Sequence, residues 1–498
     1  MSADAPLQAP AAADTRPVPS RPVAAEVGLL PLCVDLDGTL VRTDTLVEGL
    51  LVLGGSLRLS ALLAPAARGR AALKARVAEL SPPDPALLPY NQGMLDYIRS
   101  QRAAGRHIVL ATASNEATAR LIADHLGLFD EVIASSPARN LKGPAKAAAL
   151  VERFGRGGFV YAGDHRADLP VWAAAAAAVM VDVAPAVAAR VSVPVEHRIA
   201  DRPAMAATLL RAMRPHQWVK NVLVFVPIFT AGALGDWPSW GGGLLAFAAF
   251  CAAASGIYLV NDLLDLSADR AHPTKRLRPF AAGAVDLSAG MGLAVLLLLL
   301  GGVLGWLGGV LGIVVAYGVL SMAYSLRLKR LPLVDVFTLA GLYTVRMVGG
   351  GEATGHSLSL WLLAFASFLF LSLALVKRVA EVMDSSRRSS NAIAGRGYGP
   401  GDLLILQLFG VSAAFSSSLV LALYVQNEAL TRQLGSSALL WGIVPLVLLW
   451  NCRIWLATAR GHMHHDPILY AVRDRVTWAI AVCVAGLMLA ARGGAWLL

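Results

Sequence analysis

Charged residues are scarce in this chain: only 15% of its 498 residues are Asp, Glu, Lys or Arg, whereas 56% are hydrophobic and the mean hydropathy is +0.59. Cysteines are also few, and the four present (Cys33, Cys251, Cys452 and Cys483) show no paired spacing. The sequence therefore indicates neither a disulfide framework nor a thiolate metal site. The composition is typical of a membrane protein, and nearly all long uncharged segments lie after residue 217.

A continuous apolar core is missing from residues 1–28, which are rich in Ala and Pro. This pattern predicts a disordered tail rather than a cleaved signal peptide. We expect a soluble domain at 29–200, a linker at 201–217 and a membrane domain at 218–498. The formal net charge of +10 does not indicate nucleic-acid binding, because the cations of the second half cluster in alternate loops between apolar segments.

Short apolar runs alternate with Ala- and Leu-rich stretches between residues 29 and 200. The predicted strands are LLPLCVDL (29–36), HIVLATA (107–113), EVIAS (131–135), FVYAGD (159–164) and AVMVD (178–182). Apolar strands separated by helices predict a Rossmann-like α/β domain, with a parallel sheet covered on both faces. Reactive groups of such a sheet lie just beyond the carboxyl ends of its strands, and the polar residues of this domain occur there.

Four polar motifs follow these strands in order. They are VDLDGTL with Asp35 and Asp37, ATAS with Thr112, NLKGPAKAAAL with Lys142 and Lys146, and AGDHRAD with Asp164 and Asp168. Together they resemble the motifs of the haloacid dehalogenase superfamily of phosphohydrolases. A carboxylate attacks phosphorus only if a metal and a lysine neutralise the negative charges, and these residue types suit that requirement.

The resemblance implies a role for each motif. Asp35 would be the nucleophile and a Mg²⁺ ligand, and Asp37 the general acid and base. Asp164 and Asp168 would be further Mg²⁺ ligands. Thr112 and Lys146 would hold the phosphoryl group, and Lys146 is preferred because AKAAAL opens a helix. The alternative is a noncatalytic domain used for assembly.

A helical insertion with a Pro-rich exit lies between Thr45 and Pro89, where that superfamily places a small cap. Its GSLRLSALLAPAARGR segment is apolar and carries several arginines. Such a segment suits a cover over a phosphate site or contact with a membrane surface, and both interpretations stay open.

Nine uncharged or nearly uncharged segments in the second half are candidates to cross a bilayer, which takes roughly 17–25 residues. They lie at about 219–235, 238–261, 287–305, 307–326, 332–350, 357–376, 403–426, 437–452 and 476–493. This predicts an all-α polytopic domain of about nine transmembrane helices. Basic loops alternate with loops that have almost no Lys or Arg. We therefore expect an inner-membrane protein whose phosphatase domain and active sites are cytoplasmic.

The stretch NDLLDLSADRAHPTKRLRP places three carboxylates and four cations where the second apolar segment emerges into water. Asp262, Asp265 and Asp269 recur at three- and four-residue spacing, so they share one face of a continuing helix. A bridging cation relieves the repulsion among three acids, and Mg²⁺ prefers such oxygens and also binds phosphates. The stretch predicts a Mg²⁺–phosphate site; the alternative is a solvated loop that retains positive charge in the cytoplasm.

This motif, together with the nine segments, resembles the UbiA superfamily of intramembrane prenyltransferases. The resemblance implies that Mg²⁺ and a pyrophosphate are bound by Asn261, Asp262, Asp265 and Asp269, with Asp262 and Asp265 as catalytic residues. The second acidic motif of the family is incomplete here, since Asp335 is present but Leu339 occupies the position four residues later.

RPHQWVKN, the acidic stretch and LSLALVKRVAE resemble one branch of this family, decaprenyl-phosphate phosphoribosyltransferase. That reaction needs one pyrophosphate site and two monophosphate sites, which fits one acidic motif and many cations. The candidate substrate-binding residues are Lys220, Asn221, Lys275, Arg278, Tyr324, Lys329, Arg346, Lys377 and Arg396. For each cation the alternative is a role in topology alone. His462, His464, His465 and Asp466 resemble a metal cluster, but we interpret them as a polar loop because no second cluster has matching spacing.

Both resemblances together predict a bifunctional enzyme. The membrane domain would transfer 5-phosphoribose from phosphoribosyl pyrophosphate to a polyprenyl phosphate, and the phosphatase would then remove the 5-phosphate. One alternative is a prenyltransferase that uses prenyl pyrophosphate and an aromatic acceptor, joined to a phosphatase of unrelated specificity. Another is a nonenzymatic transporter or scaffold. The expected partners are the two substrates and the lipid bilayer, and homo-oligomer formation stays open.

Overall fold

The computed structural model describes residues 30–55, 59–67, 69–387, 397–426, 437–463 and 467–491. The predicted tail at 1–28 lies outside this range. The chain divides into two compact units, Met1–Arg202 and Pro203–Leu498.

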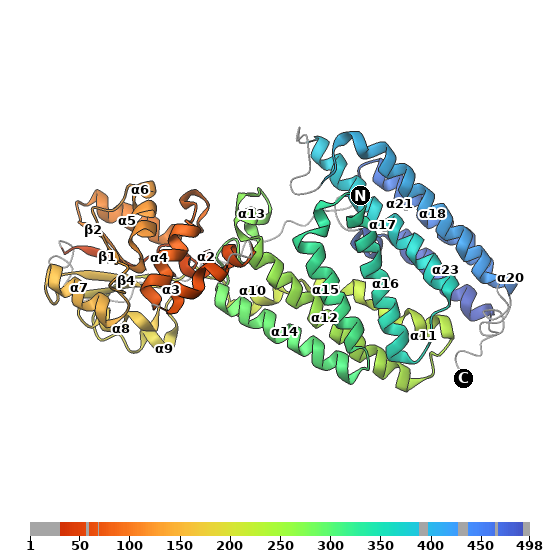
Figure 1. Cartoon of the computed structure of the whole chain (residues 1–498), viewed down its shortest axis with the longest axis horizontal. Helices are drawn as coiled ribbons and strands as arrows, with labels where there is room; N and C mark the ends of the chain where they lie inside the picture. The colour runs from red at the N-terminus through yellow and green to blue at the C-terminus, as the bar shows by residue number, and fades with distance from the viewer. Residues whose placement is uncertain are drawn as a thin grey trace, which may run out of the picture. The chain divides into compact units, whose positions relative to one another are not determined.

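A six-stranded parallel sheet with the order β3-β2-β1-β4-β5-β6 forms the first unit (Figure 1). Its strands are β1 (Leu32–Val34), β2 (Ile108–Asn115), β3 (Glu131–Ser135), β4 (Val160–Gly163), β5 (Ala177–Val181) and β6 (Val195–Ile199). Side chains alternate along each strand, so Leu32 and Val34 enter one core cluster and Cys33 enters the cluster on the opposite face. Both faces are buried, which confirms the predicted Rossmann-like α/β fold.

Helices cover the two faces of the sheet and also form an insertion after β1. One face is covered by α5 (Gln92–Ala103) and α6 (Glu116–Leu126), and the other by α7 (Pro144–Phe154) and α8 (Leu169–Trp172). Shorter elements are η3 (Arg166–Asp168) and α9 (Pro185–Ala188). The insertion contains α2 (Thr45–Gly55), η1 (Leu59–Leu62), α3 (Leu63–Ala67), α4 (Arg70–Leu80) and η2 (Pro85–Leu87). It has a small apolar cluster of its own and confirms the predicted helical cap.

The strand that sequence reasoning missed is β6. It reads VEHRI, and four of its five residues are exposed. An edge strand pairs with one neighbour only, and charged side chains there discourage pairing with another chain. The strand therefore lacks the apolar run that indicates the other five strands in the sequence.

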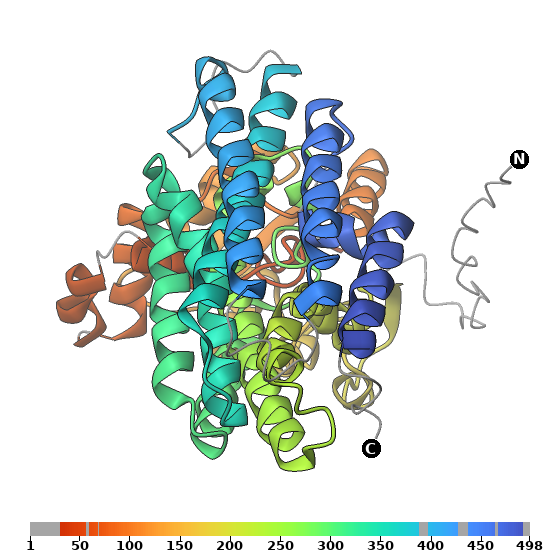
Figure 2. The ribbon, with the colours of Figure 1, turned by 90° about the vertical axis from the view of Figure 1, so that its right-hand side faces the viewer.

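The second unit is a bundle of helices that run side by side (Figure 2). Its long helices are α12 (Trp237–Leu264), α14 (Leu287–Leu307), α15 (Leu311–Leu326), α16 (Val334–Thr354), α17 (Leu360–Arg387), α18 (Leu403–Val425), α21 (Ile443–Ala459) and α23 (Arg475–Ala491). Its short helices are α10 (Met205–Ala212), η4 (Pro215–Phe225), α11 (Val226–Ala231), α13 (Leu266–Ala271), η5 (Lys275–Leu277), η6 (Leu328–Arg330), η7 (Pro400–Asp402), α20 (Ser437–Leu440) and α22 (Pro467–Arg473). Leu296, Leu299 and Val303 of α14 are exposed, as lipid-facing side chains are. The predicted all-α membrane domain is confirmed.

The predicted count of nine spans is not confirmed. In the described part of the chain, five helices are long and apolar enough to cross a membrane, and the pair α22 and α23, bent by 80°, raises this number to six if it forms one span. α15 is short, and α16 carries three charged residues: Asp335, Arg346 and Glu352.

The segment predicted as the first span, 219–235, is not one α-helix. It begins as the 3₁₀-helix η4 and continues as the six-residue α11. Pro227 contributes to this break, because proline has no N–H for the helix ladder and its ring clashes with the preceding turn. Lys220 and Asn221 of η4 are buried, so protein rather than lipid surrounds this irregular backbone.

Close packing of α18 against α21 predicts an effect on stability. A Cβ atom added at Gly410 would lie 2.1 Å from Cζ2 of Trp455. We expect Gly410→Ala to lower the thermal unfolding midpoint of the detergent-purified protein, because overpacking costs about 1–3 kcal/mol. The matched control is Gly486→Ala on α23, where a new Cβ meets no described atom within 4 Å. A midpoint for Gly410→Ala at or above that of the control would contradict this packing.

Candidate active sites

The first site begins where β1 ends, and Asp35 and Asp37 lie on the loop that follows. Gly38 completes this turn with a φ of +80°, and a Cβ atom there would lie 2.2 Å from Oδ2 of Asp164. Only glycine fits, because both the backbone angle and the space exclude a side chain. The turn brings the ends of β1 and β4 together, so Asp35 and Asp164 meet at one edge of the sheet.

Lys146 of α7 is the cation that reaches Asp35. Its Nζ lies 2.7 Å from Oδ2 of Asp35, 2.7 Å from Oη of Tyr161 and 3.8 Å from Oδ1 of Asp168. Lys146 is 2% exposed, whereas Lys142 is exposed. Tyr161, which sequence reasoning missed, also donates a 3.0 Å hydrogen bond to Asp168. It stands inside a predicted strand, where an aromatic residue is read as core.

Asp35, Asp164 and Asp168 each offer an oxygen atom within 4.8 Å of the others. Burial raises the pKa of Asp164 and of Asp168, and the charges of the neighbouring carboxylates raise both pKa values further. Hard, crowded carboxylate oxygens fit Mg²⁺, which would relieve their repulsion. These three residues would therefore hold the metal that the motif predicts.

Asp37 lies beside this cluster and has different partners. Its Oδ1 accepts a 2.8 Å hydrogen bond from the backbone N–H of Thr45, and its Oδ2 accepts one from the hydroxyl of Ser114. Burial raises the pKa of Asp37 to about 6, and the nearby charge of Asp44 acts in the same direction. A carboxyl group in this range exchanges a proton near neutral pH, as a general acid and base must.

Thr112 is buried within β2, three residues before its end, and accepts a 3.0 Å hydrogen bond from the N–H of Ser114. The motif ATAS contains both residues, but only Thr112 was singled out from the sequence. Ser114 is the one that contacts the candidate acid Asp37.

The second site lies at the end of α12, where arginines balance two buried aspartates. Arg278 NH1 lies 2.7 Å from Oδ2 of Asp269 and 3.2 Å from Oδ1 of Asp262. Arg214 NH2 lies 2.5 Å from Oδ1 of Asp262. Arg214 also packs its guanidinium 5.1 Å from the ring centroid of Tyr258. It begins the quoted motif RPHQWVKN but was not selected from the sequence.

The other predicted metal ligands of this motif have separate partners. Asn261 donates a 2.7 Å hydrogen bond to Ser325, and Lys329 lies 3.4 Å from Oδ2 of Asp265. Within the residues that the structure describes, the three aspartates of this motif do not converge as those of the first site do. Their shared role in holding Mg²⁺ stays a prediction.

A group of buried cations lies deeper in the bundle. Arg346 donates to Oδ1 of Asn221 at 2.7 Å and to Oη of Tyr317 at 2.9 Å. Nζ of Lys220 lies 5.9 Å from the ring centroid of Tyr343. Arg346 lies about three helical turns beyond Asp335 on α16. Its described hydrogen-bond partners are all neutral, so this region is positive.

The remaining candidates are spread over the second unit. Lys275 is exposed on η5, and Tyr324 and Lys377 are half-buried on α15 and α17. His462 is exposed. Four predicted residues lie outside the described ranges: Arg396, His464, His465 and Asp466. Their roles stay predictions.

Asp335, the remaining acid of the incomplete second motif, is fully buried in a different kind of contact. Its Oδ2 lies 2.5 Å from NH2 of Arg378, and its Oδ1 accepts a 2.5 Å hydrogen bond from Tyr398. The Tyr398 hydroxyl also accepts a 2.6 Å hydrogen bond from the N–H of Leu333, which has a φ of +64°. This network fixes the start of α16.

The fold and these sites define a membrane transferase joined to a phosphohydrolase. The chain belongs to the UbiA prenyltransferase family, whose pattern matches residues 222–462, and it carries a haloacid dehalogenase-like hydrolase domain at 32–173.

Three relatives show how far this similarity extends. The uncharacterized protein y4nM of Sinorhizobium fredii is 38% identical over 92% of this chain and 90% of its own length. The nodulation protein NoeC of Azorhizobium caulinodans is 36% identical over 57% of this chain and 91% of its own length. The decaprenyl-phosphate phosphoribosyltransferase of Corynebacterium glutamicum is 40% identical over 36% of this chain and 56% of its own length.

Tyr161 is expected to support the metal site through Asp168. Tyr161→Phe removes the hydroxyl that bonds both Lys146 and Asp168, and loss of such a partner typically weakens metal binding or activity 10–100-fold. We expect the Mg²⁺ concentration for half-maximal hydrolysis of p-nitrophenyl phosphate to rise about tenfold. Tyr97→Phe is the control, because Tyr97 bonds Glu196 instead. Equal Mg²⁺ dependence in the two variants would contradict this role.

Proposed function

We propose that the membrane domain transfers 5-phosphoribose from phosphoribosyl pyrophosphate to a polyprenyl phosphate, and that the N-terminal domain then removes the 5-phosphate. The observation that carries this proposal is the contrast between two acidic positions. Arg214 and Arg278, which balance Asp262 and Asp269, keep 24% and 30% of their side chains exposed, whereas Arg378 on Asp335 is 0% exposed. One acidic position is thus open to ligands, and the other is enclosed.

A single open acidic position suits a reaction with one pyrophosphate. A reaction that also needs a second metal-binding motif is disfavoured by Leu339 and by the enclosed Asp335. The decaprenyl-phosphate phosphoribosyltransferase of C. glutamicum, which is 40% identical over its aligned part, supports the same choice of substrates. We therefore assign phosphoribosyl pyrophosphate as donor and polyprenyl phosphate as acceptor.

In the transfer step, an oxygen of the lipid phosphate attacks the anomeric carbon of the ribose. The bond from that carbon to pyrophosphate breaks, and its electron pair leaves with the pyrophosphate. Arg214 and Arg278 would bind oxygens of the pyrophosphate, because guanidinium groups bind phosphate in two-point contacts. Mg²⁺ bound at Asp262 and Asp269 would offset the charge of the leaving pyrophosphate. Lys220 and Arg346 would hold a monophosphate.

In the hydrolysis step, a carboxylate oxygen of Asp35 attacks phosphorus of the 5-phosphate. The bond between phosphorus and the ribose oxygen breaks, and Asp37 gives its proton to that oxygen. Asp37 then takes a proton from water, which attacks the aspartyl-phosphate and releases inorganic phosphate. Lys146, 2.7 Å from Asp35, would balance the negative charge near the transferred group.

Joining the two domains has a physical advantage. The first product carries a polyprenyl chain and diffuses only within the membrane, so a tethered phosphatase meets it at raised effective concentration. We propose that both sites face the cytoplasm at the inner membrane, which the basic loops between the apolar segments support.

A prenyltransferase with an aromatic acceptor is the competing function, and the family match favours it as a class. Activity with prenyl pyrophosphate and 4-hydroxybenzoate, in place of the proposed substrate pair, would support it over our proposal.

The phosphatase step predicts a trapped intermediate. Asp35→Asn removes the nucleophile, so purified protein supplied with labelled phosphoribosyl pyrophosphate and polyprenyl phosphate should accumulate a 5-phosphorylated lipid, measured by chromatography. Wild type should yield the dephosphorylated lipid. Asp124→Asn on the exposed face of α6 is the matched control. Failure of Asp35→Asn to accumulate the phosphorylated lipid would contradict the coupled reaction.

A substitution at the transferase site should affect transfer and leave hydrolysis intact. Asp262→Asn should lower lipid labelling by at least about 100-fold, since it removes a charge that both arginines contact. Hydrolysis of p-nitrophenyl phosphate by the same preparation should stay unchanged. Glu352→Gln on the exposed surface of α16 is the control. Unchanged labelling in Asp262→Asn would contradict the role of Asp262, and no labelling by wild type would favour a transporter or scaffold.

A further inference from the structure

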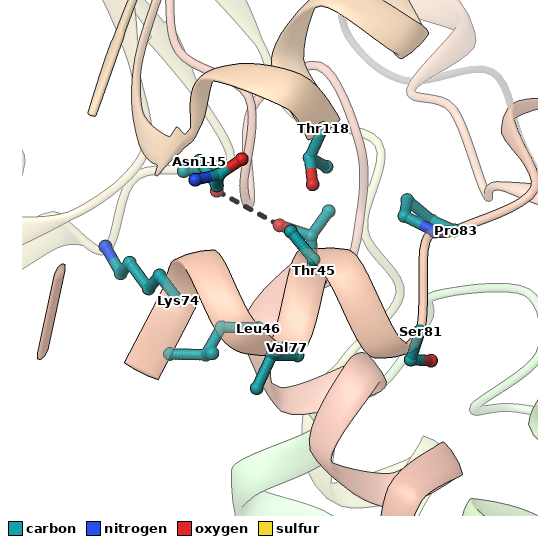
Figure 3. A pocket seen from close by; sticks show the side chains of 10 residues that line it. Thr45, Leu46, Lys74, Val77, Ser81, Pro83, Asn115 and Thr118 are labelled. Atoms are coloured by element: carbon teal, nitrogen blue, oxygen red, sulfur yellow. Dashed lines mark hydrogen bonds between the residues drawn. The ribbon is translucent and has the colours of Figure 1, made fainter. Parts of the chain in front are cut away.

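A pocket lies between the cap and the sheet of the phosphatase unit (Figure 3). Its empty volume is about 290 Å³, which includes its open mouth. Lys74 and Val77 of the cap helix α4 lie on one side, and Asn115 and Thr118 of the core lie on the other (Figure 3).

The pocket adjoins the proton donor of the site. Thr45 and Ser114 line it, and their hydroxyls lie 3.0 Å apart. Both residues also donate hydrogen bonds to Asp37, Thr45 through its backbone N–H and Ser114 through its hydroxyl. The leaving oxygen must be close to the acid that protonates it, so the pocket lies on the side of the leaving group.

The pocket wall is polar in one part and apolar in another. Hydroxyl and amide groups come from Thr45 at the start of the cap and from Ser114, Asn115 and Thr118 of the core, and the apolar side chains Leu46 and Val77 come from the cap. Sugars present hydroxyl groups around their edge and C–H groups on their faces. A pentose ring therefore fits this mixture of polar and apolar contacts better than a fully apolar or fully charged group.

Lys74 is the cation of this pocket. Its Nζ donates to the carbonyl oxygen of Ala113 at 2.6 Å and to Oδ1 of Asn140 at 3.2 Å. Both acceptors are neutral, and among the residues that the structure describes Lys74 has no carboxylate within 4.0 Å. An ammonium group with only neutral partners at a pocket wall is suited to an anion. Burial also lowers the pKa of Lys74, which an arriving anion would raise.

We propose that this pocket binds the leaving group of the phosphatase substrate, and that Lys74 recognises a second anion on it. The ligand class is a pentose 5-phosphate that carries a phosphodiester at its anomeric carbon. This inference rests on the proposed function for the choice of pentose, but the pocket and Lys74 define the requirement for a second negative charge. Lys74 would thereby favour the lipid-linked product over simple sugar phosphates.

The test uses two water-soluble substrates with the full-length protein. One is methyl riboside 5-phosphate, and the other is 5-phosphoribosyl methyl phosphate, which adds the anomeric phosphodiester. We expect wild type to hydrolyse the second substrate with a kcat/KM about tenfold higher than that of the first. The difference should lie mainly in a lower KM, because the ammonium group of Lys74 would form a charge-assisted hydrogen bond with the added phosphodiester. In Lys74→Met the preference should fall below about threefold, because kcat/KM falls much more for 5-phosphoribosyl methyl phosphate than for methyl riboside 5-phosphate. Lys74→Arg should retain the preference.

Arg76→Met is the matched control, because Arg76 lies on the same helix and pairs with Glu79 at the surface. It should keep the wild-type preference. Hydrolysis of both substrates without preference, or an equal loss for both in Lys74→Met, would overturn the role of Lys74 and leave the proposed phosphatase intact. Hydrolysis of neither substrate by wild type would contradict the proposed phosphatase itself, and this inference with it.

Discussion

In both domains, buried carboxylates at key positions lie next to cations. Lys146 lies 2.7 Å from Asp35, Arg278 lies 2.7 Å from Asp269, and Arg378 lies 2.5 Å from Asp335. Removing one member of such a pair leaves an uncompensated charge and typically costs about 3–5 kcal/mol. The positions of the site helices therefore depend on these contacts. Lys146 and Arg278 are also chemically suited to phosphate oxygens, so the proposed substrates could be bound by cations that already stabilise the sites.

The ion pairs of the membrane domain differ in their exposure to solvent, and this decides whether a ligand can replace one member of a pair. Arg214 and Arg278 are partly open to solvent, so a phosphate can reach them, whereas Arg378 and Asp335 are each 0% exposed. The enclosed pair, with Tyr398, holds the start of α16, the helix that carries Arg346. In the proposed function, one acidic position of the membrane domain would bind ligands, and the other would hold the start of α16.

Local patterns in the sequence predicted the features that depend on neighbouring residues. Strands β1 to β5, the cap and the order of the phosphatase motifs are of this kind. Contacts between distant segments were missed, because no spacing rule links Arg214 to Asp262 or Ser114 to Asp37. Composition was misleading at two places. The apolar segment 219–235, which contains Pro227, is not the single span that its composition predicts. The edge strand β6 is charged, so its composition does not indicate a strand.

We propose above all that the phosphatase acts on the product of the transferase. The most direct test is to measure release of inorganic phosphate from phosphoribosyl pyrophosphate that is radiolabelled in its 5-phosphate, with purified wild-type protein. Release should require polyprenyl phosphate and should disappear in Asp262→Asn, although that variant still hydrolyses p-nitrophenyl phosphate. Release at the same rate without the lipid, or in Asp262→Asn, would contradict the claim.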